Sequence, residues 1–298
     1  MSNLTARRHA REVLQAHHAG GLPVDVSGIV HARGLRVQTV QSIRPGVFGA
    51  LYIDAADVGV YLSDECFSPQ HRRFTLAHEL GHYVIDGHVE ALIPGGTGLA
   101  PSLGGNFRDQ VSRFEREADL FAAELLMPQE AVASVVGETT PSIAMVQSLA
   151  NECETSISSA AIRVTEATAE MAITILSYHR TIEWYACCPS LQDHKWARTR
   201  LKGEWTPERS VTSKAFSSRT PRNFVGQSTH TLLCEWFDGA PAECSVDEEC
   251  IVLGDYGRVL TLLRPIGLAT ADELEESEQR DAEHVRDWRS TLRGYELD

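Results

Sequence analysis

The feature that most constrains this chain is the pentapeptide His78-Glu79-Leu80-Gly81-His82, which matches the pattern His-Glu-x-x-His. It lies within residues 68–86, which the sequence predicts to be helical because Ser68-Pro69 is a helix start signal. On a helix, positions four apart differ by only about 40° in direction, so both imidazoles point from one face and can share a cation. Glu79 is rotated by about 100° from His78 and lies beside that cation, where a general base belongs. The pentapeptide therefore predicts a metal site with His78 and His82 as ligands and Glu79 as the catalytic base.

A catalytic zinc site needs a third protein ligand and one open position. A second predicted helix, residues 109–126, carries several carboxylates. Glu117 lies on a partly apolar face with the residues three before, four after and seven after it, and this face should pack against the first helix. Glu115 and Asp119 lie on other faces, so Glu117 is the leading candidate, with His88 as the rival. Two imidazoles and a carboxylate suit one Zn2+ ion and also accept Mn2+.

Composition limits the class of protein. The chain has 298 residues with a formal net charge of -14, and its apolar runs are shorter than the roughly 20 residues that span a bilayer. The arginines near the start are followed by no apolar stretch of a secretory signal, so we expect a cytoplasmic protein with no membrane partner. Seven cysteines without a C-x-x-C pair argue against a disulfide framework.

The order of predicted elements indicates an α+β fold in three parts. Two short helices, a strand at 35–40 and a hairpin of strands at 48–53 and 58–62 precede the pentapeptide. Helices are expected at 141–152 and 156–165, followed by strands at 172–179, 184–187, 230–237 and 259–263 and an acidic terminal helix opened by Thr270. We place the parts at residues 1–130, 131–168 and 169–298.

Residues 149–164 have the texture of a helix-turn-helix. Arg163 is the only cation there that could contact DNA, and Glu152 and Glu154 would repel phosphate. A packing element is the favoured interpretation, and DNA contact by this segment stays open.

A basic stretch follows in the third part. Between Lys195 and Arg222 there are eight basic residues against two acidic ones, with aromatic residues interleaved. Cations beside exposed aromatic rings suit single-stranded nucleic acid, whereas a solvated loop with core aromatics is the alternative. The candidate nucleic-acid-binding residues are Lys195, Arg198, Arg200 and Lys202.

Two runs of sequence carry a resemblance to a known family. The run Arg73–Tyr83 and the run Glu115-x-Glu117-Ala118-Asp119-x-Phe121-Ala122-Ala123-Glu124-Leu125-Leu126-Met127-Pro128 resemble the ImmA/IrrE family of metallopeptidases over about the first 165 residues. The resemblance implies a zincin-like peptidase domain in which the Glu directly before Ala is the third zinc ligand, here Glu117. It also implies a site-specific endopeptidase that cuts a helix-turn-helix repressor of stress, mobile-element or antiphage genes.

The same resemblance suggests a regulatory third part. IrrE-like proteins carry a C-terminal domain similar to a GAF sensor, and antiphage-associated relatives of the CapP type are linked to activation by single-stranded DNA. We therefore expect a zinc endopeptidase activated by DNA damage or single-stranded DNA through residues 169–298. The alternative is a DNA-binding regulator on a degenerate peptidase scaffold, and the retained Glu79 argues against it.

Overall fold

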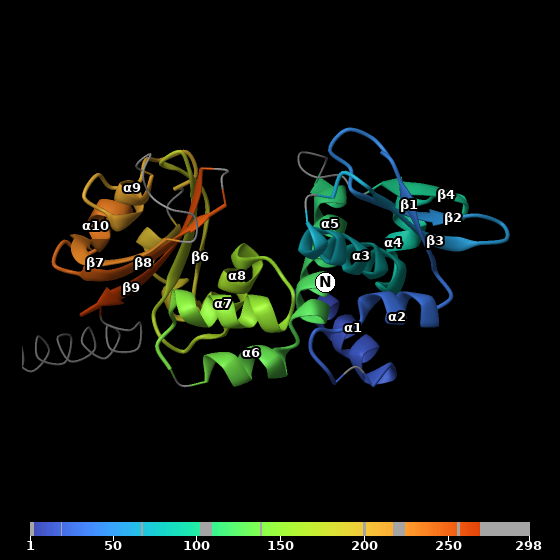
Figure 1. Cartoon of the computed structure of the whole chain (residues 1–298), viewed down its shortest axis with the longest axis horizontal. Coiled ribbons are helices and arrows are strands. Elements are labelled where there is room, and N and C mark those ends of the chain that lie inside the picture. Colours follow the sequence, from blue (N-terminus) through green and yellow to red (C-terminus); the bar gives the residue numbers. More distant parts are fainter. Residues whose placement is uncertain are drawn as a thin grey trace, which may run out of the picture. The chain divides into compact units, whose positions relative to one another are not determined.

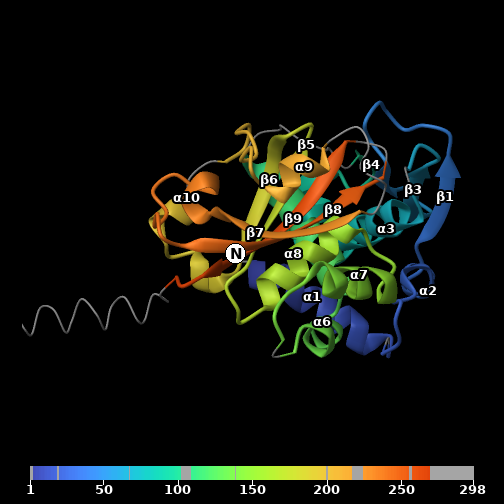
Figure 2. The same cartoon turned by 60° about the vertical axis from the view of Figure 1, so that its left-hand side comes forward.

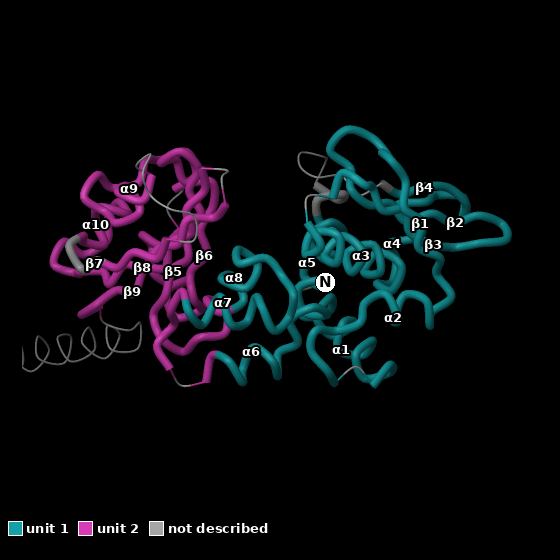
Figure 3. Tube along the Cα trace, viewed as in Figure 1, with its two compact units in different colours: residues 1–135, 144–163 teal, residues 136–143, 164–298 magenta. Residues whose placement is uncertain are grey.

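The computed structural model of the chain describes residues 3–18, 20–66, 68–101, 109–137, 139–198, 201–216, 224–254 and 257–268. The chain forms two compact units (Figure 3). Unit 1 comprises Met1–Val135 and Ala144–Arg163, and unit 2 comprises Val136–Ile143 and Val164–Asp298. The helical segment that the sequence sets apart at 131–168 is thus shared between the two units rather than forming one of its own.

Unit 1 contains a four-stranded sheet in the order β1-β3-β2-β4 (Figure 1). Its strands are β1 (Arg36–Val40), β2 (Gly49–Ile53), β3 (Val58–Ser63) and β4 (Gly98–Pro101). The expected hairpin is present as the antiparallel pair β2 and β3, closed where the Asp54 N–H donates to the Asp57 carbonyl at 2.7 Å. β4 is absent from the elements expected from the sequence. Gly95, Gly96 and Gly98 have φ of +109°, +79° and +151°, a backbone that returns the chain antiparallel to β2.

The helices of unit 1 lie mainly to one side of this sheet (Figure 1). They are α1 (Asn3–Ala16), α2 (Val26–Ala32), α3 (Pro69–Val84), α4 (His88–Leu92), α5 (Asp109–Leu126) and α6 (Gln129–Val136), followed by α7 (Ile143–Glu152) and α8 (Ile157–Ala167), which extend across the division between the units. α3 begins as expected, with the Ser68 hydroxyl accepting from the His71 N–H at 3.1 Å.

α3 packs closely against α5 because both helices carry small residues where they meet. A Cβ added at Gly81 would lie 3.0 Å from the ring of Phe121 and 3.3 Å from Cα of Ala118. This tight contact fixes which residues of α5 face the histidines of α3.

A buried carboxylate ties α8 to α5 and α1. Glu124 is fully buried and accepts from Arg163 at 3.0 Å and from Arg11 at 2.9 Å. Arg163 is only 5% exposed and also donates to the carbonyl of Met127 at 3.0 Å. Arg163 is the cation that made residues 149–164 a candidate for DNA contact. Because it is buried in the interior of unit 1, the packing interpretation is supported.

Unit 2 contains an antiparallel sheet in the order β6-β5-β9-β8-β7 (Figure 2). Its strands are β5 (Ile173–Tyr178), β6 (Thr181–Cys187), β7 (Val225–Leu232), β8 (Ser245–Leu253) and β9 (Arg258–Ile266). Two short helices, α9 (Val211–Ala215) and α10 (Leu233–Trp236), pack on the face that carries Val246 and Cys250 of β8. Two 3-10 turns, η1 (Pro189–Leu191) and η2 (Lys195–Arg198), complete the described elements.

Two expectations for unit 2 are wrong. The strand expected at 230–237 ends at Leu232, where the Leu232 N–H donates to Glu235 at 3.2 Å and α10 begins. β8 was not expected because acidic residues interrupt its apolar pattern. Glu248 is nevertheless fully buried and accepts from the Thr212 N–H at 2.9 Å and from its hydroxyl at 2.6 Å. The acidic terminal helix expected from the sequence falls outside the described residues. None of the described helices is long and apolar enough to span a membrane.

Candidate metal centre

Three side chains from α3 and α5 converge on one point in unit 1. The Nε2 atoms of His78 and His82 lie 3.0 Å apart, and the two oxygens of the Glu115 carboxylate lie 3.4 Å from one Nε2 each. His78 is 6% exposed and His82 is 1% exposed. These three residues form a group whose ligand atoms all lie within 4.8 Å of one another.

The spacing of these donors fits a tetrahedral metal ion. Ligand bonds of about 2.0 to 2.1 Å to zinc place neighbouring donors of a tetrahedron about 3.3 to 3.4 Å apart. The 3.0 Å between the two Nε2 atoms and the 3.4 Å from each Nε2 to one carboxylate oxygen are close to that edge, and three protein ligands leave a fourth position for a water or a substrate. The donor set of two imidazoles and one carboxylate is also one that zinc accepts.

Glu117 does not join this group, which corrects the sequence-based expectation. Its carboxylate accepts from Arg113 at 2.9 Å and lies 3.1 Å from Nε2 of His88. The reason is the contact between the helices. Ala118 lies over Gly81, so Glu115, nearly one turn before Ala118, faces the histidines while Glu117 points to one side.

The second nitrogen of each histidine is held by another side chain. Nδ1 of His78 lies 2.8 Å from Oδ1 of Asp119, and Nδ1 of His82 lies 3.0 Å from Nδ1 of His88. His88, the rival ligand in the sequence, therefore contacts the back of His82 rather than its Nε2. With both Nδ1 atoms occupied, the Nε2 atoms are the ones directed at the shared point.

Glu79 is fully buried beside this group. It lies close enough to His78 to raise the pKa of that imidazole, after larger effects of burial and hydrogen bonding. Gly49 at the start of β2 makes room for it, because a Cβ there would lie 2.6 Å from Oε1 of Glu79. The carboxylate is thus confined between α3 and the sheet.

The ionisable groups of this cluster differ in their pKa values. Burial lowers the pKa of His78, but hydrogen bonds with Asp119 and Glu115 outweigh it and raise that pKa to about 10. Burial lowers the pKa of His82 to about 4. Burial raises the pKa of Glu115, yet the hydrogen bonds of both imidazoles bring it down to about 2. Near neutral pH the raised pKa of His78 leaves its imidazole protonated, whereas the lowered pKa of His82 leaves its imidazole neutral.

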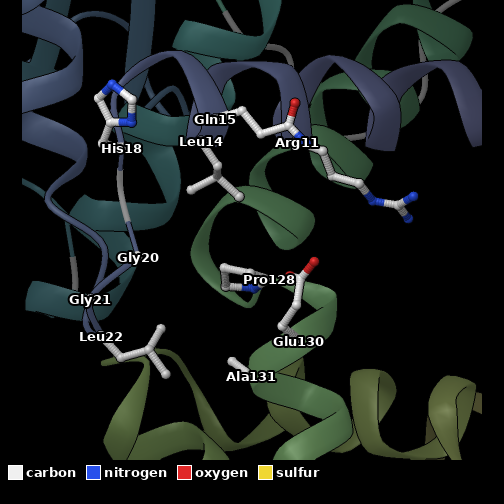
Figure 4. A pocket seen from close by; sticks show the side chains of 10 residues that line it. All are labelled: Arg11, Leu14, Gln15, His18, Gly20, Gly21, Leu22, Pro128, Glu130 and Ala131. Carbon is white, nitrogen blue, oxygen red and sulfur yellow. The ribbon is translucent and has the colours of Figure 1, made fainter.

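Two cavities of unit 1 differ in their relation to the centre. One of about 180 Å³ is lined in part by Phe74, Leu126 and Met127, and the Phe74 ring lies 6.2 Å from the ring of His78. Polar residues, among them His71 and Thr155, line the rest of this cavity. The other, of about 770 Å³, lies between the end of α1 and Pro128–Ala131 and includes none of the metal-centre residues (Figure 4).

The residues of the basic stretch of unit 2 differ in their exposure to solvent. Lys195, Arg198 and Lys202 are exposed, whereas Arg200 lies outside the described residues. Trp196 is only 7% exposed and belongs to the core of unit 2, so it offers no stacking surface. Trp205 is 68% exposed, with the Arg180 guanidinium 5.8 Å from its ring. Binding of nucleic acid by these residues stays a prediction.

The site has the composition that is typical of single-metal peptidases. It combines a helix with the pattern His-Glu-x-x-His and a carboxylate from a second helix. Residues 57–165 match the family model of the IrrE N-terminal-like domain, a peptidase family, and this part of the chain is similar to that family.

The relatives cover different parts of the chain. The radiation response metalloprotease IrrE of Deinococcus radiodurans is 32% identical over 109 residues, which are 37% of this chain. The chain spans about a third of that protein, since the match covers 31% of its length. A Mycobacterium tuberculosis transcriptional regulator is similar in fold, with a TM-score of 0.55, 13% identity and coverage of 88% of this chain and 76% of that one.

Proposed function

We propose that this chain is a zinc-dependent, site-specific endopeptidase that cleaves a transcriptional repressor of the helix-turn-helix type. The observation that carries the proposal is the convergence of the Nε2 atoms of His78 and His82 with the carboxylate of Glu115 beside the buried Glu79. The similarity to a radiation response metalloprotease supports the same activity.

The residues of the centre have distinct roles in this reaction. His78, His82 and Glu115 hold the ion, which is zinc by donor type, although Mn2+ fits the same donors. When bound, zinc supplies Lewis acidity toward water and the peptide carbonyl. Glu79 accepts the proton of the attacking water and returns it to the nitrogen of the leaving amine. Its burial between α3 and β2 keeps the carboxylate in one position during both transfers.

Unit 2 is the regulatory part in this proposal. A signal of DNA damage, sensed as single-stranded DNA, acts through a sensor domain similar to a GAF domain and activates the peptidase in the cytoplasm. The support lies in the exposed cations Lys195, Arg198 and Lys202, which precede the exposed ring of Trp205. Cleavage of the repressor then releases stress or antiphage genes.

Cleavage of a co-encoded repressor by purified protein tests the activity. With one zinc per chain, the wild type is expected to cut at a single site, and Glu79→Gln to cut about 10² to 10⁴ times more slowly because the general base is lost. Zinc content should be equal in both, since Glu79 is no ligand. Removal of zinc by a chelator should abolish cleavage, and restoring zinc should recover it.

The alternative function gives a different result. A DNA-binding regulator on a degenerate peptidase scaffold would bind its operator with no cleavage, and Glu79→Gln would change nothing. Equal cutting by both proteins, or no cutting by the zinc-loaded wild type with single-stranded DNA present, would exclude the proposed mechanism.

A further inference from the structure

A series of hydrogen bonds runs from Nδ1 of His82 through His88 and Glu117 to the exposed Arg113. Nδ1 of His82 lies 3.0 Å from Nδ1 of His88, and Nε2 of His88 lies 3.1 Å from Oε2 of Glu117. The other oxygen of Glu117 accepts from Nε of Arg113 at 2.9 Å. Metal ligation does not explain the positions of His88, Glu117 and Arg113, because the ligand group consists of His78, His82 and Glu115.

The direction of each hydrogen bond follows from the chemistry at the ends. A carboxylate only accepts, so Nε2 of His88 must donate to Glu117. The neutral His88 then has a lone pair on Nδ1 and accepts there from Nδ1–H of His82. A neutral His82 with its proton on Nδ1 has its lone pair on Nε2, the nitrogen that faces His78 and Glu115.

The surroundings leave His88 little freedom to do anything else. It is fully buried, and its ring meets the ring of Phe114 edge-on, with centroids 4.8 Å apart and planes at 69°. Both of its nitrogens have partners. Flipping the ring would place Cδ2–H opposite Nδ1–H of His82 and leave that donor without an acceptor, and the site offers no solvent to compensate.

We propose that His88, fixed by Glu117, is a positioning residue that sets the tautomer and orientation of His82 for metal binding. The inference rests on the proposed function only in taking Nε2 of His82 as a ligand atom. The two histidines of the site are thus held differently. His78 is held directly by the carboxylate of Asp119, whereas His82 is held by a carboxylate acting through a second imidazole.

Zinc affinity, measured by competition with a chromogenic chelator, tests this role without any cleavage assay. His88→Phe keeps a flat ring but has no acceptor for His82, and a weakening of about 10- to 100-fold is expected. His88→Gln retains a carbonyl that accepts and an N–H that donates, so it should recover most of the affinity. Glu90→Gln, an exposed change on the same helix α4, is the matched control and should bind zinc like the wild type.

Imidazole NMR on the zinc-loaded wild type provides a second readout that needs no variant to fold. Long-range proton–nitrogen spectra should show His82 protonated at Nδ1 and His88 protonated at Nε2. A proton on Nδ1 of His88, or zinc affinity of His88→Phe equal to that of the wild type, would overturn the proposal.

The outcomes also separate this inference from the proposed function. If the expected affinities and tautomers are found but no repressor is cut, the positioning role stands and the endopeptidase proposal fails. If the repressor is cut but His88→Phe binds zinc normally, the endopeptidase proposal stands and the positioning role of His88 fails.

Discussion

Gly49 and Glu79 show how one missing side chain supports the site. A Cβ at position 49 would lie 2.6 Å from Oε1 of Glu79 and 2.4 Å from Cγ2 of Thr75, too close for either to remain in place. Gly49→Ala should therefore displace the Glu79 carboxylate and lower the cleavage rate about 10- to 100-fold, because misplacing a catalytic group by about 1 Å has effects of this size. Single-turnover cleavage of the repressor would measure the rate.

This prediction has two controls, the zinc affinity of Gly49→Ala and the cleavage rate of a second glycine variant. Gly49→Ala should bind zinc as tightly as the wild type, because the contact involves no metal ligand. A Cβ at Gly20 would meet nothing within 4 Å, so Gly20→Ala should cleave normally. A normal rate for Gly49→Ala would mean that the carboxylate of Glu79 does not need its observed position.

The sequence predicts part of the site because the spacing within one helix is fixed. His78, Glu79 and His82 follow from the helical repeat alone. The third carboxylate depends instead on how α5 is rotated against α3, and small residues decide that rotation. A preference for apolar faces selected Glu117, whereas the contact of Gly81 with Ala118 places Glu115 at the histidines. A small residue on each helix is the signal that could have indicated the correct face.

At the scale of elements, the pairing of Glu124 with Arg163 holds α8 against α5. Arg163→Met should destabilise the protein by about 2 to 4 kcal/mol, because it removes a charged partner from a fully buried carboxylate that keeps Arg11 at 2.9 Å. Urea unfolding followed by circular dichroism would measure the loss.

An exposed ion pair on α1 gives the matched control. Arg8 and Glu12 lie 3.5 Å apart with both side chains exposed, so Arg8→Met should change stability by less than about 1 kcal/mol. If Arg163→Met were equally harmless and instead abolished binding to duplex DNA, residues 157–167 would be a DNA-reading helix after all.

The elements themselves were predictable where one local pattern decides them. α3, α5 and the hairpin of β2 and β3 follow from capping, periodicity and a polar turn. β8 could not be predicted in this way, because the burial of Glu248 and Glu249 depends on partners distant in the sequence. Glu249 accepts from the N–H of Ile143 at 2.8 Å and pairs with Arg264 at 2.8 Å, and no local pattern reveals such contacts.

At the scale of the whole molecule, charge is distributed unevenly. The chain has a net charge of -14, yet Lys195, Arg198 and Lys202 are exposed within eight residues of unit 2. An acidic protein with a local basic stretch repels nucleic acid at most of its surface and binds it, if at all, at that stretch. The burial of Trp196 leaves Trp205 as the exposed tryptophan that could stack on a base there.

Neutralising these cations tests whether unit 2 senses single-stranded DNA. In the full chain, Lys195→Gln, Arg198→Gln and Lys202→Gln together should weaken binding of a labelled oligothymidine at least about 10-fold and reduce the salt dependence by about two counterions, as three lost phosphate contacts imply. Basal repressor cleavage should be unchanged, while its stimulation by the oligonucleotide should disappear. Removing three exposed cations of unit 1, Arg8, Arg36 and Arg44, changes the net charge equally and should leave both properties intact. Equal losses in the two triple variants would show that net charge, rather than this stretch, governs binding.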